Sequence, residues 1–158
     1  MSKRIGVPLE FKYNLAMRGW SSVLNGFLYV IREKHGAAEA LELLERLFKM
    51  DNRVKNLTNT VKTIFRIEGN DTETMAQWLE TFWEICGYEG TWLERSKTIA
   101  RNKVTKCPWK TAYADLSDWT LNWCIMVAKT INPKMTVERP KGMCAGDPYC
   151  EYVYKIEE

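Results

Sequence analysis

The first half of the chain has the hydrophobic periodicity of helices. Apolar residues recur three and four positions apart, which is the spacing of one face of an α-helix. This pattern predicts four helices, over residues 8–31, 37–50, 54–64 and 72–86. Gly36 and Gly87 are the expected stops of the first and fourth helices, and Asp71 or Thr72 is the expected cap of the fourth. The links are short, so neighbouring helices are expected to run back along one another.

The second half of the chain predicts strands on either side of one long helix. Residues 91–107 contain two β-compatible runs around a polar centre, which predicts a hairpin that turns near Ser96. A long helix is expected from about Lys110, and Asn132 followed by Pro133 stops it. Apolar and polar residues alternate in two later stretches, which predicts strands over residues 135–140 and 149–156.

The order of these elements predicts the fold class and the domain organisation. Four helices followed by β-β-α-β-β indicate an α+β fold, in which N-terminal helices pack with a mostly antiparallel sheet. The chain has 158 residues, which is long enough for one domain with a real core. We therefore expect a single domain over residues 1–158, with a helical part at about 8–87 and the sheet with its long helix at about 91–156.

The composition changes this picture in one respect, which is the number of aromatic residues. The chain contains seven Trp and seven Tyr. So many large rings in a short chain indicate packed layers, a pocket for a small molecule, or both. They also suit the interface of a homodimer, which is the protein partner that we consider.

Charge and cysteine content limit the partners and the compartment. The net charge is +3 and no stretch strings basic residues together, so we expect no nucleic-acid partner. No apolar run approaches the roughly 18 residues of a spanning helix, and the N-terminus lacks the apolar region of a signal peptide. We therefore expect no membrane partner and a cytoplasmic location. The five cysteines are then expected to be free thiols.

Several motifs of the second half resemble a known family. They are "IEGND" at 67–71, "VTKCPW" at 104–109, a Trp-rich helix that contains Cys124, and "INPKMTVERPKGMCAGDPYCEYVY" at 131–154. Together they resemble the L-2-amino-thiazoline-4-carboxylic acid hydrolase family, and the tail alone resembles the end of 4-vinyl reductase (V4R) domains. The first resemblance implies hydrolysis of a C–N or C–S bond in a small cyclic substrate. The second implies a small-molecule-binding module that performs no reaction.

The hydrolase resemblance makes two cysteines the candidate catalytic thiols. Cys107 and Cys144 both lie at predicted strand ends beside turns, where functional side chains are often placed. Cys107 also precedes the predicted helix start and has Lys106 beside it, a setting that stabilises a thiolate. The simpler interpretation is that the cysteines are small buried hydrophobic residues, and for Cys86 and Cys150 we favour it.

The same hypothesis assigns roles to further residues. Asp147 and His35 would handle protons, although a turn-shaping Asp and a solvated helix-terminal His are the simpler interpretations. The expected substrate-binding residues are Trp109, Cys124, Cys150 and Trp83, because binding sites for small molecules are mostly apolar.

A metal site is a third hypothesis, and it depends on the same thiols. Five residues separate Cys144 from Cys150, whereas a zinc knuckle has two to four. We therefore expect no metal ligand set and no cofactor. A site formed by Cys107, Cys124, Cys144 and Cys150 stays open at this point, because tertiary structure alone would assemble it.

Overall fold

A computed structural model describes residues 8–157, and within them the chain forms five α-helices and one four-stranded sheet. The helices are α1 Leu9–His35, α2 Ala37–Lys49, α3 Arg53–Ile64, α4 Thr72–Cys86 and α5 Asp118–Ile131. The strands are β1 Glu89–Arg95, β2 Ile99–Lys106, β3 Met135–Lys141 and β4 Cys150–Ile156. The predicted α+β class is confirmed, as is the order of β-β-α-β-β after four helices.

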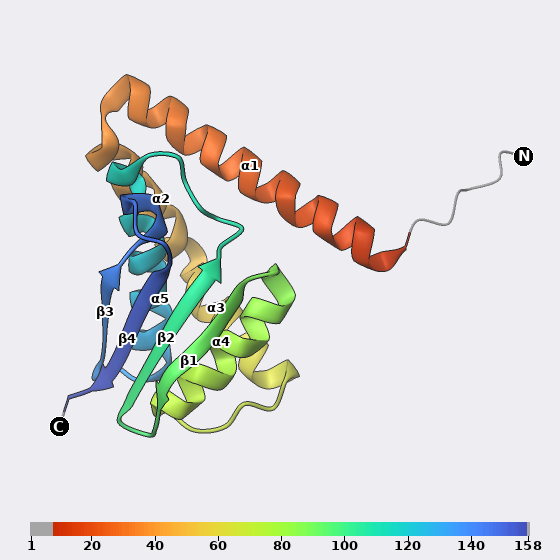
Figure 1. The fold of residues 1–158 in the computed structure, drawn as a ribbon, viewed down its shortest axis with the longest axis vertical. Coiled ribbons are helices and arrows are strands. Elements are labelled where there is room, and N and C mark those ends of the chain that lie inside the picture. Colours follow the sequence, from red (N-terminus) through yellow and green to blue (C-terminus); the bar gives the residue numbers. More distant parts are fainter. Residues whose placement is uncertain (1–7, 158) are drawn as a thin grey trace, which may run out of the picture.

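The sheet has the strand order β1-β2-β4-β3, and every neighbouring pair is antiparallel. Successive residues of a strand point to opposite faces, so Ala100 and Asn102 of β2 share one face with Tyr152 and Tyr154 of β4, their partners across the ladder. All four side chains are buried. The helices α4 and α5 pack against this inner face, and Figure 1 shows α3, α4 and α5 behind the sheet.

The fourth helix is held at both ends and in its middle. The Asp71 carboxylate accepts a hydrogen bond from the Thr74 backbone N–H at 2.8 Å, and this capping box satisfies N–H groups that have no partner inside the helix. Gly87 ends the helix at a φ of 74°, a left-handed conformation that costs glycine little. Fully buried Trp78 donates its indole N–H to the Thr58 carbonyl of α3 at 3.2 Å. These contacts orient the inward face of α4.

The predicted start of the long helix is wrong, because α5 begins at Asp118 and not near Lys110. The segment before it forms turns and a short 3-10 helix, and it also bonds to α1. The Tyr29 hydroxyl accepts from the Ala112 backbone N–H at 2.9 Å, and Asn25 donates to the Lys110 carbonyl at 3.3 Å. A helix that began at Lys110 would need the Lys110 carbonyl for its own ladder.

One buried arginine joins β3 to the beginning of α5. The side chain of Arg139 is 8% exposed, and its guanidinium donates to the Ser117 carbonyl at 2.6 Å and to the Asp118 carboxylate at 2.7 Å. The register of β3 against β4 shifts between Glu138 and Lys141, where Pro140 lies in an edge strand. This irregularity lets Arg139 leave the ladder pattern and reach α5.

The first helix is only partly covered. Its second half packs on α2, where Leu28, Ala40 and Leu44 are buried. On the same helix, Trp20 is 68% exposed and Phe27 is 69% exposed. Figure 1 shows α1 reaching beyond the rest of the molecule toward its N-terminal end. None of the helices within residues 8–157 combines the length and the apolar character that crossing a bilayer requires.

Candidate ligand cavity

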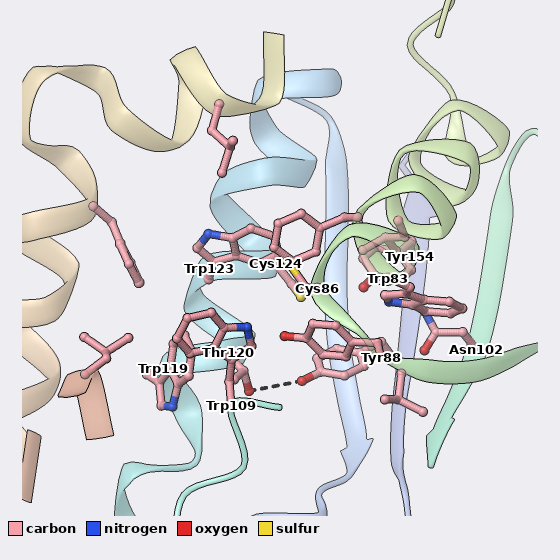
Figure 2. Close-up of a pocket in the computed structure, with 17 residues that line it drawn as sticks. Trp83, Cys86, Tyr88, Asn102, Trp109, Trp119, Thr120, Trp123, Cys124 and Tyr154 are labelled. Atoms are coloured by element: carbon pink, nitrogen blue, oxygen red, sulfur yellow. Dashed lines mark hydrogen bonds between the residues drawn. The ribbon is translucent and has the colours of Figure 1, made fainter. Parts of the chain in front are cut away.

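A cavity of about 300 Å³ lies between α4, α5 and the inner face of the sheet. Its size is at the lower end of the range of roughly 300–1,000 Å³ for small-molecule sites. Figure 2 shows the side chains around it. Most of them are aromatic or aliphatic. The lining residues are Leu24, Phe48, Leu57, Leu79, Phe82, Trp83, Cys86, Tyr88, Asn102, Val104, Trp109, Trp119, Thr120, Trp123, Cys124, Tyr152 and Tyr154.

Local periodicity explains why these residues face the same space. The helix α4 contributes side chains at i, i+3, i+4 and i+7, which lie on one helix face: Leu79, Phe82, Trp83 and Cys86. The helix α5 contributes the pairs Trp119–Thr120 and Trp123–Cys124, one turn apart. The strands β2 and β4 contribute alternate residues of their inner faces.

Contacts between rings hold the aromatic wall in place. Phe82 lies between Trp78 and Trp123, with ring centroids 5.1 Å and 4.7 Å away. Trp83 stacks on Trp92 of β1 at 5.4 Å. Aromatic pairs at such distances add to the stabilisation that burial provides. The wall is therefore packed ring against ring, and a preformed site of this kind lowers the cost of binding.

Few polar groups face this apolar space, and two of them lack partners. Asn102 is 1% exposed, and neither its amide nitrogen nor its amide oxygen has a hydrogen-bond partner among residues 8–157. The indole nitrogen of Trp119 is also buried without a partner. Most buried polar groups in proteins are satisfied. A bound molecule is one way to satisfy these atoms.

The other polar groups of the wall are satisfied or neutral. The Tyr152 hydroxyl donates to the Thr120 hydroxyl at 3.1 Å, which is the bond drawn in Figure 2. Burial raises the pKa of Tyr88, Tyr152 and Tyr154 well above the usual value, so all three stay protonated at neutral pH. The Asn102 amide lowers the pKa of the Tyr154 hydroxyl in part, although no hydrogen bond of normal geometry joins the two side chains.

The lining residues include no Asp, Glu, Lys, Arg or His. A charged ligand would lose its hydration without gaining a partner of opposite charge, and that loss is costly in an apolar site. The cavity is therefore suited to a neutral molecule.

The structure brings three of the four expected substrate-binding residues to the cavity. Trp83, Trp109 and Cys124 line it. Trp109 also packs edge-on against Trp119, with ring centroids 5.9 Å apart. Cys150 is buried but lies outside the lining, and its sulfur accepts the Met143 backbone N–H at 3.2 Å.

The expected catalytic residues do not line the cavity, and the assumed setting of Cys107 is wrong. No helix begins after this residue, so no helix dipole acts on its sulfur. Burial raises the pKa of Cys107 to about 12. Hydrogen bonds from the Trp109 backbone and from the Tyr88 side chain lower this pKa in part. Its thiol is therefore protonated at neutral pH. Cys144 is half-buried in the turn before β4.

The remaining expected residues have structural contacts or lie at the surface. The Asp147 carboxylate accepts the Gly142 backbone N–H at 2.8 Å, as in a turn-shaping role. His35 is exposed in the last turn of α1. Within residues 8–157, no three His, Cys, Asp or Glu side chains have the arrangement of a metal site. All five cysteines are free.

Sequence reasoning missed several lining residues. We interpreted Cys86 as a buried hydrophobic residue only, and Asn102 was not considered. A signal for Asn102 was present, because it is in phase with apolar Ala100 and Val104 along the strand. A polar residue on the buried face of a strand indicates either a buried network or a ligand contact. No such signal in the sequence indicated that Tyr88 and Thr120 line the cavity.

Comparisons with known proteins show which folds this chain resembles. No family model matches it, and no curated protein matches it in sequence. Its structure is similar to trafficking protein particle complex subunit 3 from Naegleria fowleri, covalently bound to palmitic acid, with a TM-score of 0.67 at 13% identity, over 91% of this chain and 96% of that chain. It is also similar to the phenol-responsive sensory domain of the transcription activator PoxR with phenol, with a TM-score of 0.57 at 12% identity, over 89% of this chain and 74% of that chain. The chain shares its α+β fold with both.

Proposed function

We propose that this protein binds a small, neutral, largely aromatic molecule in the cavity between α4, α5 and the sheet. The observation that carries the proposal is the cavity itself, about 300 Å³ lined by aromatic side chains and by no charged residue. Both similar structures are described with a small molecule, palmitic acid in one and phenol in the other. The binding-module alternative that the V4R-like tail implies agrees with this proposal.

The cost of such a cavity supports a binding role. Protein interiors are packed like organic crystals, and voids larger than a water molecule are few. An apolar void removes contacts from every side chain that lines it, so it lowers stability. Here it lies beside fully buried residues such as Trp78 and Tyr154. A ligand that fills the cavity would restore the missing contacts.

Filling the cavity with a side chain is the direct test. The probe is N-phenyl-1-naphthylamine, a neutral aromatic dye whose fluorescence rises in apolar surroundings. Cys124→Phe places a ring in the cavity, whereas Ile125→Phe adds a ring at the next position of α5, outside the lining. We expect wild type and I125F to bind the dye, and C124F to bind it at least about tenfold more weakly. Equal binding by the two folded variants would show that the dye binds elsewhere.

The hydrolase activity stays a prediction from the family resemblance. It requires Cys107 or Cys144 to act on a substrate bound nearby. The cavity thiols Cys86 and Cys124, together with Cys107, have pKa values raised to about 12 by burial, which leaves little thiolate at neutral pH. This favours binding over thiolate attack. Turnover of a thiazoline carboxylate that is lost in C107S or in C144S would support the enzyme instead.

The cytoplasmic location remains part of the proposal. Free thiols persist in reducing compartments, whereas secreted proteins usually pair them. All five cysteines of this chain are free.

We also propose that a second copy of this chain covers the exposed face of α1. An apolar groove of about 420 Å³ runs between α1 and α2, and Trp20, Val23, Phe27 and Leu43 are among the residues that line it. At their exposures, Trp20 and Phe27 alone present roughly 250–300 Å². Each partner of a stable complex contributes roughly 800 Å². The other exposed apolar residues of α1 and α2 extend the surface toward that size.

Charges on the two helices favour a copy of the same chain. The first half of α1 carries Lys12 and Arg18 together with Glu10, and α2 carries Glu39 and Glu42 in its first two turns. In a two-fold arrangement, the basic part of each α1 can approach the acidic part of the partner's α2, because a symmetric interface pairs each patch with its counterpart. Each copy would thus place its own α1 against the groove of the other copy.

A further inference from the structure

Asn102 lies in a position that packing alone does not explain. It is on the inner face of β2, between Ala100 and Val104 and opposite Tyr152 of β4. Figure 2 shows it on the opposite side of the cavity from Trp119. Such positions usually hold Val or Ile, which suit the surface of a buried strand. A carboxamide there needs a hydrogen-bond partner or it lowers the stability of the protein.

Among residues 8–157 the structure supplies no such partner. Both amide atoms of Asn102 are buried and unpaired there, and the residue is one of those that line the cavity. The Asn102 amide lowers the pKa of the Tyr154 hydroxyl, but the two side chains form no hydrogen bond of normal geometry. A molecule in the cavity that reaches this side chain would supply the missing partners.

The chemistry of a carboxamide defines the group that would match it. Asn presents an N–H donor and a C=O acceptor side by side. A ligand makes both hydrogen bonds at once when it also presents an acceptor and a donor side by side, as a carboxamide or a lactam does. A hydroxyl group makes one good bond at a time in this geometry. A carboxylate offers acceptors only and would bring an unpaired charge to a lining without cations.

We infer that Asn102 selects the ligand and that the ligand is a neutral aromatic carboxamide or lactam. The aromatic wall around Trp83, Tyr88 and Trp123 binds the ring, and Asn102 binds the amide edge. This inference rests on the proposed function, because it names the ligand class of the same cavity.

The test compares three compounds of nearly the same shape. Naphthalene-2-carboxamide has a donor and an acceptor, 2-acetylnaphthalene has an acceptor only, and 2-isopropenylnaphthalene has neither. Each is titrated against N-phenyl-1-naphthylamine bound to the wild type, to Asn102→Leu and to the control Asn122→Leu. Asn122 lies on α5 outside the cavity lining. Hydrophobicity alone would rank the hydrocarbon first and the carboxamide last.

We expect the wild type and N122L to bind the carboxamide about tenfold more tightly than the ketone, because two hydrogen bonds replace one. We expect N102L to lose that preference and to bind the hydrocarbon best. We also expect N102L to melt at a higher temperature than the wild type without ligand, because the unpaired amide is gone.

The outcomes separate this inference from the proposed function. If the compounds displace the dye in the same order from wild type and N102L, the role of Asn102 is wrong and the binding function stands. If neither the dye nor any compound binds the wild type, the binding function is wrong as well. Should N102L not fold, Asn102→Val replaces it. A wild type that binds the carboxamide no more tightly than the ketone already overturns the inference.

Discussion

Individual cysteines show how burial decides the chemistry of a side chain. Cys86 and Cys124 are each 7% exposed, and both border the cavity. Burial raises the pKa of each thiol from 9.0 to about 12, because an apolar environment disfavours the thiolate. For Cys124, a hydrogen bond with Tyr154 and the charge of Arg139 act weakly in the opposite direction. Both residues therefore behave as neutral wall groups at neutral pH.

These raised pKa values predict a dependence of stability on alkaline pH. Between about pH 9 and pH 12 the unfolded chain releases thiol protons that the folded protein retains. The free energy of unfolding is therefore unaffected by these groups below pH 8 and falls as the pH rises through that window, by at most about 1.4 kcal/mol per pH unit for each thiol. Urea unfolding at pH 8, 9, 10 and 10.5 measures the slope.

The double variant C86A/C124A serves as the comparison for this pH effect. Its stability is expected to fall less steeply above pH 9, although buried tyrosines still contribute to the slope. Truncation of the two side chains lowers stability at every pH, so the slopes are compared and not the absolute values. Identical slopes in the two proteins would contradict the assignment.

At the scale of elements, the cavity depends on how α5 is attached to the sheet. Arg139 of β3 bonds to the first turn of α5 through Ser117 and Asp118, and its guanidinium also lies 3.3 Å from the Thr120 hydroxyl. Thr120 in turn accepts the Tyr152 hydroxyl at the cavity wall. One buried side chain thus links an edge strand, a helix start and the wall of the binding site.

Replacing this arginine by lysine is expected to destabilise the protein. Arg139→Lys retains the charge but loses the planar fork that reaches several acceptors. We expect a loss of about 2–3 kcal/mol in the free energy of unfolding, because buried acceptors are left without donors. Arg53→Lys is the matched control, since Arg53 makes only an exposed 4.0 Å pair with Asp51. It should change stability by less than about 0.5 kcal/mol. Similar effects of both changes would argue against the bridging role of Arg139.

At the scale of the whole molecule, the ligand cavity and the proposed dimer surface meet at α1. Leu24 of this helix lines both the cavity and the α1–α2 groove. A partner that packs on the groove would therefore restrain a residue of the cavity wall. Dimer formation and ligand binding are then expected to be coupled, and each should change the affinity of the other by the same factor.

The dimer is tested by a charge placed in the groove. Phe27→Glu puts a carboxylate where the partner would pack, and we expect it to convert the dimer to a monomer. Leu93→Glu is the control, because Leu93 is 51% exposed on β1, away from the groove. Light scattering with size-exclusion chromatography gives the mass of each protein. A monomeric wild type across the micromolar range would rule out this interface.

Much of the fold could be predicted from the sequence because its signals are local. The stretch around Asp71 and Gly87 contains a cap, an apolar face and a stop within 17 residues, and α4 has those bounds. The alternation from Cys150 to Ile156 likewise placed Tyr152 and Tyr154 on one face of β4, and both line the cavity. Glu151 and Val153 of the opposite face are buried too. Where local preference and tertiary contacts disagreed, as near Lys110, the contacts with α1 decided the structure.

The sequence by itself determined the elements of this protein, their order and the aromatic residues available to a site. Hydrophobic periodicity and caps act between residues a few positions apart, so they can be read along the chain. The tertiary structure alone decided where space stays open, because a cavity depends on side chains from elements far apart in the sequence. Trp83, Asn102 and Tyr154 share a wall for that reason. It also left Asn102 without a partner, which no local pattern determines.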